Sequence, residues 1–223
     1  MKFQEKLIAV QLRKRGWSYK KILTKIKVAK STLSLWLRDV ELTFQQKEKL
    51  LKGREKSRYA GAKARQRQRI EKTEKIINVA KEEAKILFKN PLFSSGLMLY
   101  WAEGAKSNES IKFSNSDPIM IKFMMKWFRD ICNVPEKKIR IAVHMHELHC
   151  RKDIEQYWSK ITNIPLKQFQ KTYIKPTSLK HRKNILYNGT CSVVIADRDL
   201  FRKIQGWRLG FIGKFNIKDV PVA

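Results

Sequence analysis

The feature that most constrains the fold is a long basic stretch that cannot build a core of its own. No proline precedes Pro91, and residues 44–72 hold eleven Lys or Arg against three Glu, a local net charge of +8. Good helix formers dominate this stretch, and apolar residues are sparse before Ile70. We therefore expect a long helix, broken near Gly53 or Gly61, whose second half docks on a core. It separates an N-terminal module from a C-terminal one.

Composition limits the partners of such a chain. The 223 residues include 49 Lys or Arg and only 20 Asp or Glu, for a formal charge of +29. This excess favours a polyphosphate partner over an anionic membrane surface. No apolar run approaches the ~20 residues that span a bilayer, the start does not resemble a signal peptide, and the three cysteines are widely spaced. We expect a cytoplasmic, nucleoid-associated protein with domains at 1–42, 43–90 and 91–215 and a tail at 216–223.

The N-terminal module has the pattern of three short helices. Apolar residues recur at helical spacing over 3–15 and 18–26, and a third helix starts at Ser31 or Thr32. Two short helices joined by a tight turn are typical of a helix-turn-helix. The string GWSYKKILTKIKVAKSTLSLWLRDV resembles the helix-turn-helix of resolvase-type recombinases and related regulators. A three-helix protein-interaction module with a solvated basic face is the alternative.

A recognition helix in the major groove would place specific side chains on DNA. Leu35 would be able to touch a thymine methyl group. The candidates for base contact are Lys30, Thr32, Ser34 and Arg38. Lys20 and Lys21 would lie near phosphates. The basic stretch that follows is expected to contact phosphates, with Arg65 as the candidate residue. A solvated spacer and a dimerising helix remain alternatives, although the heptad pattern is too weak to favour a coiled coil.

The C-terminal module mixes helical and strand periodicity. The expected helices cover 92–103, 117–132, 153–162 and 200–207, and the expected strands cover 110–114, 139–146, 169–174 and 191–196. Asp117 and Pro118 form a strong helix start, with aspartate as N-cap and proline at the first helical position. The module is therefore α+β, with a sheet that helices cover on one face and that can meet a ligand on the other.

One carboxylate stands out in this cationic chain. The segment 96–104, GLMLYWAEG, is an apolar helix that ends in Glu103 and Gly104. An acid at the C-terminal end of a helix is disfavoured by the helix dipole, and glycine is a natural residue to end the helix. If this end faces a polyanion, a cation must lie between them. The sequence thus favours a metal-assisted site on nucleic acid.

The same segment carries a family resemblance. GLMLYWAEG followed by FSNSDP resembles the LAGLIDADG homing-endonuclease family, whose nonapeptide is matched at Leu99, Ala102, Glu103 and Gly104. The resemblance implies an αββαββα unit, here with extra elements. Two such units pack their motif helices together and set a saddle of strands on DNA. With a single motif in the chain, it implies a homodimer.

The resemblance also implies roles for individual residues. Glu103 would hold a divalent metal, Mg²⁺, for double-strand cleavage, with Lys106 as the basic residue that balances charge. The alternative is that Glu103 pairs with a nearby lysine and caps a dimer seam without catalysis. The other candidates for DNA contact in this module are Lys112, Lys171, Lys175, Lys180, Arg182 and Lys183.

A cluster of potential metal ligands remains open to two interpretations. His144, His146, His149 and Cys150 lie within seven residues. They could form a zinc site if a turn brings His149 or Cys150 back to the strand, or they could be a polar strand face that touches DNA.

Taken together, the sequence predicts a homodimeric, sequence-specific double-stranded DNA-binding protein of homing-endonuclease type, with possible cleavage. A non-cleaving transcriptional or architectural regulator on the same fold is the alternative, and an RNA-binding protein is a third hypothesis. No membrane partner and no small-molecule cofactor are expected.

Overall fold

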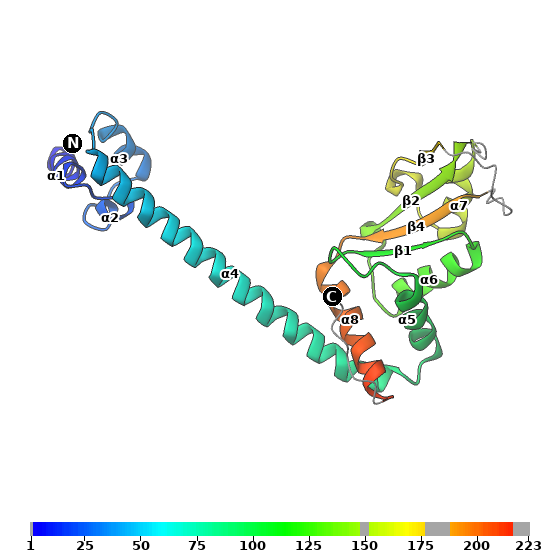
Figure 1. The fold of residues 1–223 in the computed structure, drawn as a ribbon. Coiled ribbons are helices and arrows are strands. Elements are labelled where there is room, and N and C mark those ends of the chain that lie inside the picture. Colours follow the sequence, from blue (N-terminus) through cyan, green and yellow to red (C-terminus); the bar gives the residue numbers. More distant parts are fainter. Residues whose placement is uncertain (1, 148–151, 177–187, 216–223) are drawn as a thin grey trace. The chain divides into compact units, whose positions relative to one another are not determined.

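The chain divides into two compact units, residues 1–70 and 71–223. A computed structural model describes residues 2–147, 152–176 and 188–215. The boundary between the units falls inside one helix, α4 (Phe44–Leu87), which belongs to both (Figure 1).

The first unit begins with three short helices around a small apolar core. They are α1 (Phe3–Lys14), α2 (Tyr19–Leu23) and α3 (Lys30–Trp36). Ser18 caps α2, since its hydroxyl accepts a hydrogen bond from the backbone N–H of Lys21 at 3.2 Å. The second helix is shorter than the sequence predicted. The buried core consists of Ala9, Ile22, Ile26, Leu33 and Leu37.

Helix α4 is continuous, so the predicted break near Gly53 or Gly61 is wrong. Neither glycine has a positive φ. A single glycine costs a helix only about 1 kcal/mol, and the strong helix formers around both residues outweigh that cost. Residues 51–70 are exposed, apart from the half-buried Gly61.

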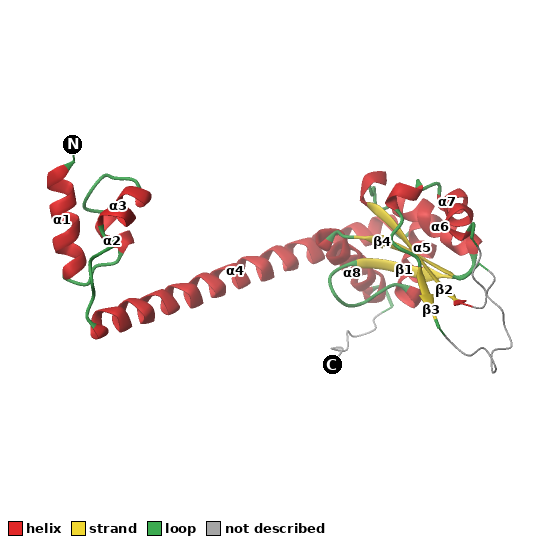
Figure 2. Cartoon of the chain, turned by 90° about the horizontal axis from the view of Figure 1, so that it is seen from above, coloured by secondary structure: helices red, strands yellow, loops and turns green. Residues whose placement is uncertain are grey.

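The second unit is a mixed α+β fold built on a sheet with the strand order β1-β4-β2-β3. The strands are β1 (Ile111–Asn115), β2 (Ile139–His146), β3 (Tyr173–Lys175) and β4 (Thr190–Ile195). β4 pairs antiparallel with both β1 and β2, whereas β3 pairs parallel with β2. The helices are α5 (Pro91–Glu103), α6 (Pro118–Asp130), α7 (Ile154–Thr162) and α8 (Arg198–Gly213) (Figure 2). The unit also contains the short 3₁₀ helices η1 (Glu136–Lys138) and η3 (Leu166–Gln168).

Local sequence explains where two of these helices start. The Asn90 side chain accepts hydrogen bonds from the backbone N–H groups of Leu92 and Phe93, with Pro91 at the first helical position. The Asp117 side chain accepts a hydrogen bond from the backbone N–H of Ile119 at 2.8 Å, and Pro118 takes the first helical position. The predicted aspartate–proline start of α6 is confirmed.

Helices α4 and α8 cross at very short distance within the second unit. Gly206 and Gly210, one turn apart on α8, face the small Ala80 and Ala84 of α4. Ala80 and Ala84 are 1% and 2% exposed, so glycine and alanine together let the two backbones meet. This contact anchors the second half of α4 to the core, as the sequence predicted.

The described elements do not reproduce the αββαββα order that the family resemblance implies. A single antiparallel bridge, Gly104 to Phe113, stands where a strand before β1 is expected. Helix α7 and strand β3 lie between β2 and β4 in the chain. The strand predicted over 169–174 is wrong in extent, because Phe169 forms only an isolated bridge to Ile141 and regular pairing begins at Tyr173.

Candidate nucleic-acid interface

The two faces of the sheet differ sharply in chemistry. The inward side chains of β1, β2 and β4 are fully buried, among them Phe113, Ile141 and Val193. They pack with α5, α6, α7 and α8 into one core that contains Trp127, Trp158 and Trp207. The alternate side chains of the same strands form the open face and are mostly polar, the exceptions being Ala142 and Val194. The prediction of a sheet covered on one face is therefore confirmed (Figure 1).

The register of the strands places two cations and two hydroxyls in neighbouring rows of the open face. Lys112 of β1 and Arg140 of β2 both lie opposite Val194 of β4. In the next row, the hydroxyl groups of Ser114 and Ser192 are 2.8 Å apart and share a hydrogen bond. Lys112, Arg140 and Ser114 can contact phosphate or base edges without a change in the backbone. Ser192 is only 1% exposed, so it holds the Ser114 hydroxyl and does not reach a ligand itself.

An aromatic pair completes the face toward the β3 edge. His144 of β2 lies opposite Tyr173, and their ring centroids are 5.7 Å apart with a tilt of 55°. Partial burial, and then the positive charge of Lys112, lower the pKa of His144. The ring is therefore neutral at pH 7 and can both donate and accept a hydrogen bond.

Glu103 lies beside the opposite edge strand. It is the last residue of α5, and the next residue, Gly104, forms the bridge to Phe113 of β1. A Cβ at position 104 would lie 2.4 Å from the carbonyl oxygen of Tyr100, so glycine allows this tight exit from the helix. The Lys106 ammonium donates to the carbonyl oxygen of Ala102 at 3.3 Å. The structure thus brings Glu103, Lys106 and Lys112 to one edge of the sheet.

The side chain of Glu103 is exposed and has no partner among the residues that the structure describes. The predicted alternative, an ion pair with a nearby lysine, is therefore not formed within the described chain. Within that same part of the chain, no group of three His, Cys, Asp or Glu gathers as a metal site. His144 and His146 share a strand face, whereas His149 and Cys150 lie outside the described residues.

The remaining predicted cations of this unit divide between one sheet edge and the residues that are not described. Lys171 precedes β3 and Lys175 ends it, and both are exposed. Lys180, Arg182 and Lys183 lie outside the described residues.

In the first unit, α3 presents one exposed face. Lys30 and Ser34 are exposed on it, and Leu35 is 61% exposed. Arg38 is also exposed but lies in the turn after the helix ends at Trp36. Thr32 is half-buried and lies at the margin of this face. Lys20 is exposed, while the ammonium of Lys21 lies 4.1 Å from the centre of the Trp17 ring. Arg65 is exposed on α4.

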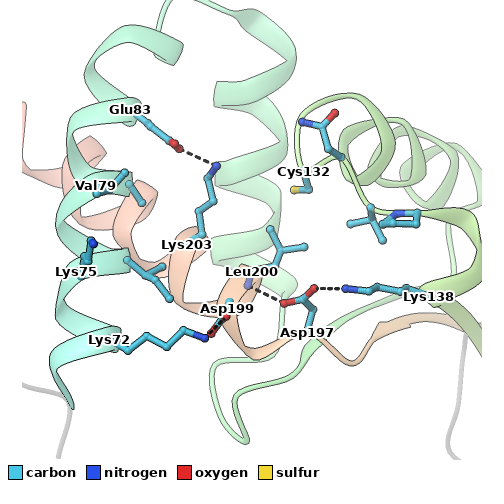
Figure 3. A pocket seen from close by; sticks show the side chains of 15 residues that line it. Lys72, Lys75, Val79, Glu83, Cys132, Lys138, Asp197, Asp199, Leu200 and Lys203 are labelled. Atoms are coloured by element: carbon cyan, nitrogen blue, oxygen red, sulfur yellow. Dashed lines mark hydrogen bonds and ion pairs between the residues drawn. The ribbon is translucent and has the colours of Figure 1, made fainter. Parts of the chain in front are cut away.

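A separate groove of about 780 Å³ lies elsewhere on the second unit (Figure 3). Its apolar lining includes Val79 and Leu200, and ion pairs cross its rim. These are Lys72 with Asp199 at 2.5 Å, Lys138 with Asp197 at 2.8 Å and Lys203 with Glu83 at 3.0 Å. Its three carboxylates pair with these three lysines, which leaves Lys75 as a single excess positive charge in the lining, so the groove is a weak site for a polyanion. None of the predicted site residues that the structure describes lines it.

Sequence reasoning missed Arg140 and Ser114 as site residues. The signal was present in the alternation of buried and polar residues along β1 and β2, which assigns every second side chain to the open face. No helix in the described part of the chain is both long and apolar enough to cross a membrane. The chain matches no family model, no curated protein and no solved structure.

Proposed function

We propose that the protein is a sequence-specific double-stranded DNA-binding protein that works as a homodimer. The helix-turn-helix reads the major groove through α3, and the open face of the sheet lies on the phosphate backbone. The observation that carries this proposal is the polar, uncovered sheet face with lysines at both edges, in a chain of formal charge +29. Such a surface concentrates a polyanion, and its hydroxyl, imidazole and guanidinium groups can fix its position.

The homodimer is supported by the outward side of α5. No charged residue occurs between Pro91 and Ala102, and Met98 and Leu99 are only half-buried. A helix without charge on any side is normally buried, so a second copy of the chain is the occupant that this surface fits. The resemblance to the LAGLIDADG nonapeptide assigns the same helix to a dimer seam. A light-scattering mass of two subunits, reduced to one by Leu99→Lys, tests this arrangement.

Metal-dependent cleavage is the second candidate function, and Glu103, which is exposed and has no partner within the described residues, favours it. Mg²⁺ is commonly held by one or two carboxylates together with waters and substrate phosphates, so such a carboxylate beside the proposed DNA-binding face fits the ion. Glu103 would hold the metal, which when bound supplies charge neutralisation and an activated water. Lys106 and Lys112 add positive charge at the same edge. A regulator that binds without cutting is the alternative on this fold.

Selection from a randomised duplex library, followed by cleavage assays with Mg²⁺ or Mn²⁺, tests both functions. Enrichment of one site and a steep fall of affinity with salt are expected, about −0.9 in log–log slope per phosphate contact. Cleavage that Glu103→Gln abolishes, with binding retained, supports the nuclease. Tight binding to intact DNA supports the regulator. A flat salt response, or preference for RNA of the same sequence, contradicts the proposal.

A further inference from the structure

The exposed half of α4 carries its cations in two rows that repeat every eleven residues. Row A consists of Lys52, Lys56, Lys63 and Arg67. Row B consists of Arg54, Arg58, Arg65 and Arg69. Eleven residues complete about three turns, so each row stays on one side of the helix. Row B is offset from row A by two residues, or about 200°, which places the rows on nearly opposite sides.

The side chains of both rows are accessible to a partner. All eight residues are exposed, as are the other residues between 51 and 70 apart from the half-buried Gly61. Arg69 also interacts within the chain, and Lys52 forms an ion pair with Glu48 at 2.7 Å, although the Lys52 side chain remains 74% exposed. The whole 52–69 segment belongs to the first unit.

The arrangement opposes helix formation in the isolated chain. Each row places like charges four residues apart twice, and such pairs destabilise a helix. A helix that serves as a solvated spacer is usually stabilised by ion pairs between a Glu and a Lys four residues later. Within residues 52–70 the only acid is Glu55, and the residue four positions after it is Tyr59, so no such pair starts in this segment. A coiled coil requires an apolar seam, but one side between the rows carries Gly53, Ser57, Ala64 and Gln68. Neither a spacer nor a dimerising helix accounts for the pattern.

We propose that residues 52–69 lie in the major groove of a DNA duplex, with row A on the phosphates of one strand and row B on those of the other. A single backbone can neutralise only one row, because the rows point in nearly opposite directions. The major groove is about 12 Å wide and admits an α-helix, whose diameter is about 10–12 Å. The small residues between the rows allow close approach to the groove floor. This inference rests on the proposed function, namely that the chain binds duplex DNA.

Two four-fold variants test the placement, one with row A and one with row B replaced by Gln, which keeps the helix propensity. The control replaces four exposed lysines outside both rows and outside the proposed interface: Lys89, Lys122, Lys160 and Lys167. With the selected duplex, each row variant should reduce the log–log salt slope by about 3–4, and the control by much less. In phosphate-ethylation interference, the row A variant should lose phosphate contacts on one DNA strand, and the row B variant should lose them on the other strand.

The outcomes separate this inference from the proposed function. Loss of contacts on the same strand in both variants would show that the helix tracks a single backbone. An unchanged slope in both variants, with normal wild-type affinity, would show a solvated spacer and overturn the groove placement alone. Failure of the wild-type chain to bind duplex DNA would overturn the proposed function as well.

Discussion

Replacement of Gly206 by alanine tests how closely α4 and α8 must approach. A Cβ at this position would lie 2.6 Å from both the Cβ of Ala80 and the carbonyl oxygen of Ile77. It would also lie 3.0 Å from the Cα of Ile77. No rotamer change can move these atoms, so the two helices must separate to admit one methyl group.

The expected cost follows from two opposing effects. Alanine gains about 1 kcal/mol over glycine in a helix interior. Overpacking of a tight core costs about 1–3 kcal/mol, and the upper value applies here because the contact is with backbone, about 0.8 Å short of the 3.4 Å at which ordinary contact begins. The net destabilisation should be about 2 kcal/mol. For a unit of this size, that lowers the melting temperature by roughly 4–8 °C.

The same helix offers a matched control. A Cβ on Gly213 would meet nothing within 4 Å, so Gly213→Ala should leave stability unchanged or slightly higher. Urea and thermal unfolding of the full chain, followed by tryptophan fluorescence, suit this test because Trp127 and Trp207 belong to the affected core. If Gly206→Ala proves as stable as Gly213→Ala, the close crossing of α4 and α8 is refuted.

Two further predictions concern charges of the second unit. Arg202, whose side chain is 7% exposed, donates to a carboxylate oxygen of Glu109 at 2.8 Å. Arg202→Leu should lower the free energy of unfolding in urea by about 2 kcal/mol, because the substitution leaves the part-buried Glu109 carboxylate without this ion pair. A change below about 0.5 kcal/mol would contradict this prediction. Burial and the charge of Lys112 lower the pKa of His144 in the folded chain. The neutral ring therefore contributes its full stability at a pH above the unfolded-state pKa of about 6.5, and this stability is lost as the pH falls through the lower pKa of the folded state. The melting temperature of His144→Gln should therefore fall less than that of the wild type between pH 7.5 and 5.5, and equal slopes would count against this assignment.

Much of the second unit could be predicted because local signals agree with tertiary packing. Strand β2 covers the predicted 139–146, since an alternation of apolar and polar residues that only Ala142 interrupts matches a sheet with one buried face. Helix α8 extends six residues beyond the predicted end at Trp207. Gly210 and Gly213 suggest a stop in the sequence, but Gly210 packs on the backbone of α4, and only the fold reveals that contact.

The candidate interface was less accessible to sequence reasoning. Glu103 was found because a lone acid ends an apolar helix, and that signal is local. Its proximity to Lys112 depends on the bridge from Gly104 to Phe113, which joins residues nine apart through an irregular turn. Arg140 was missed because one arginine among 49 basic residues carries no distinct signal until the strand register gives it a face.

The net charge of the chain gives its two proposed associations opposite dependences on salt. Two subunits of formal charge +29 repel each other, while the α5 surface that would join them carries no charge before Glu103. Added salt screens this repulsion, so the dimer should tighten between 0.05 and 0.5 M NaCl, whereas DNA binding should weaken over the same range. At low salt, DNA itself would supply the neutralising charge, and the dimer should form on the duplex. Sedimentation equilibrium with and without DNA measures both effects, and a dimer that weakens with salt would indicate an ionic interface in place of α5.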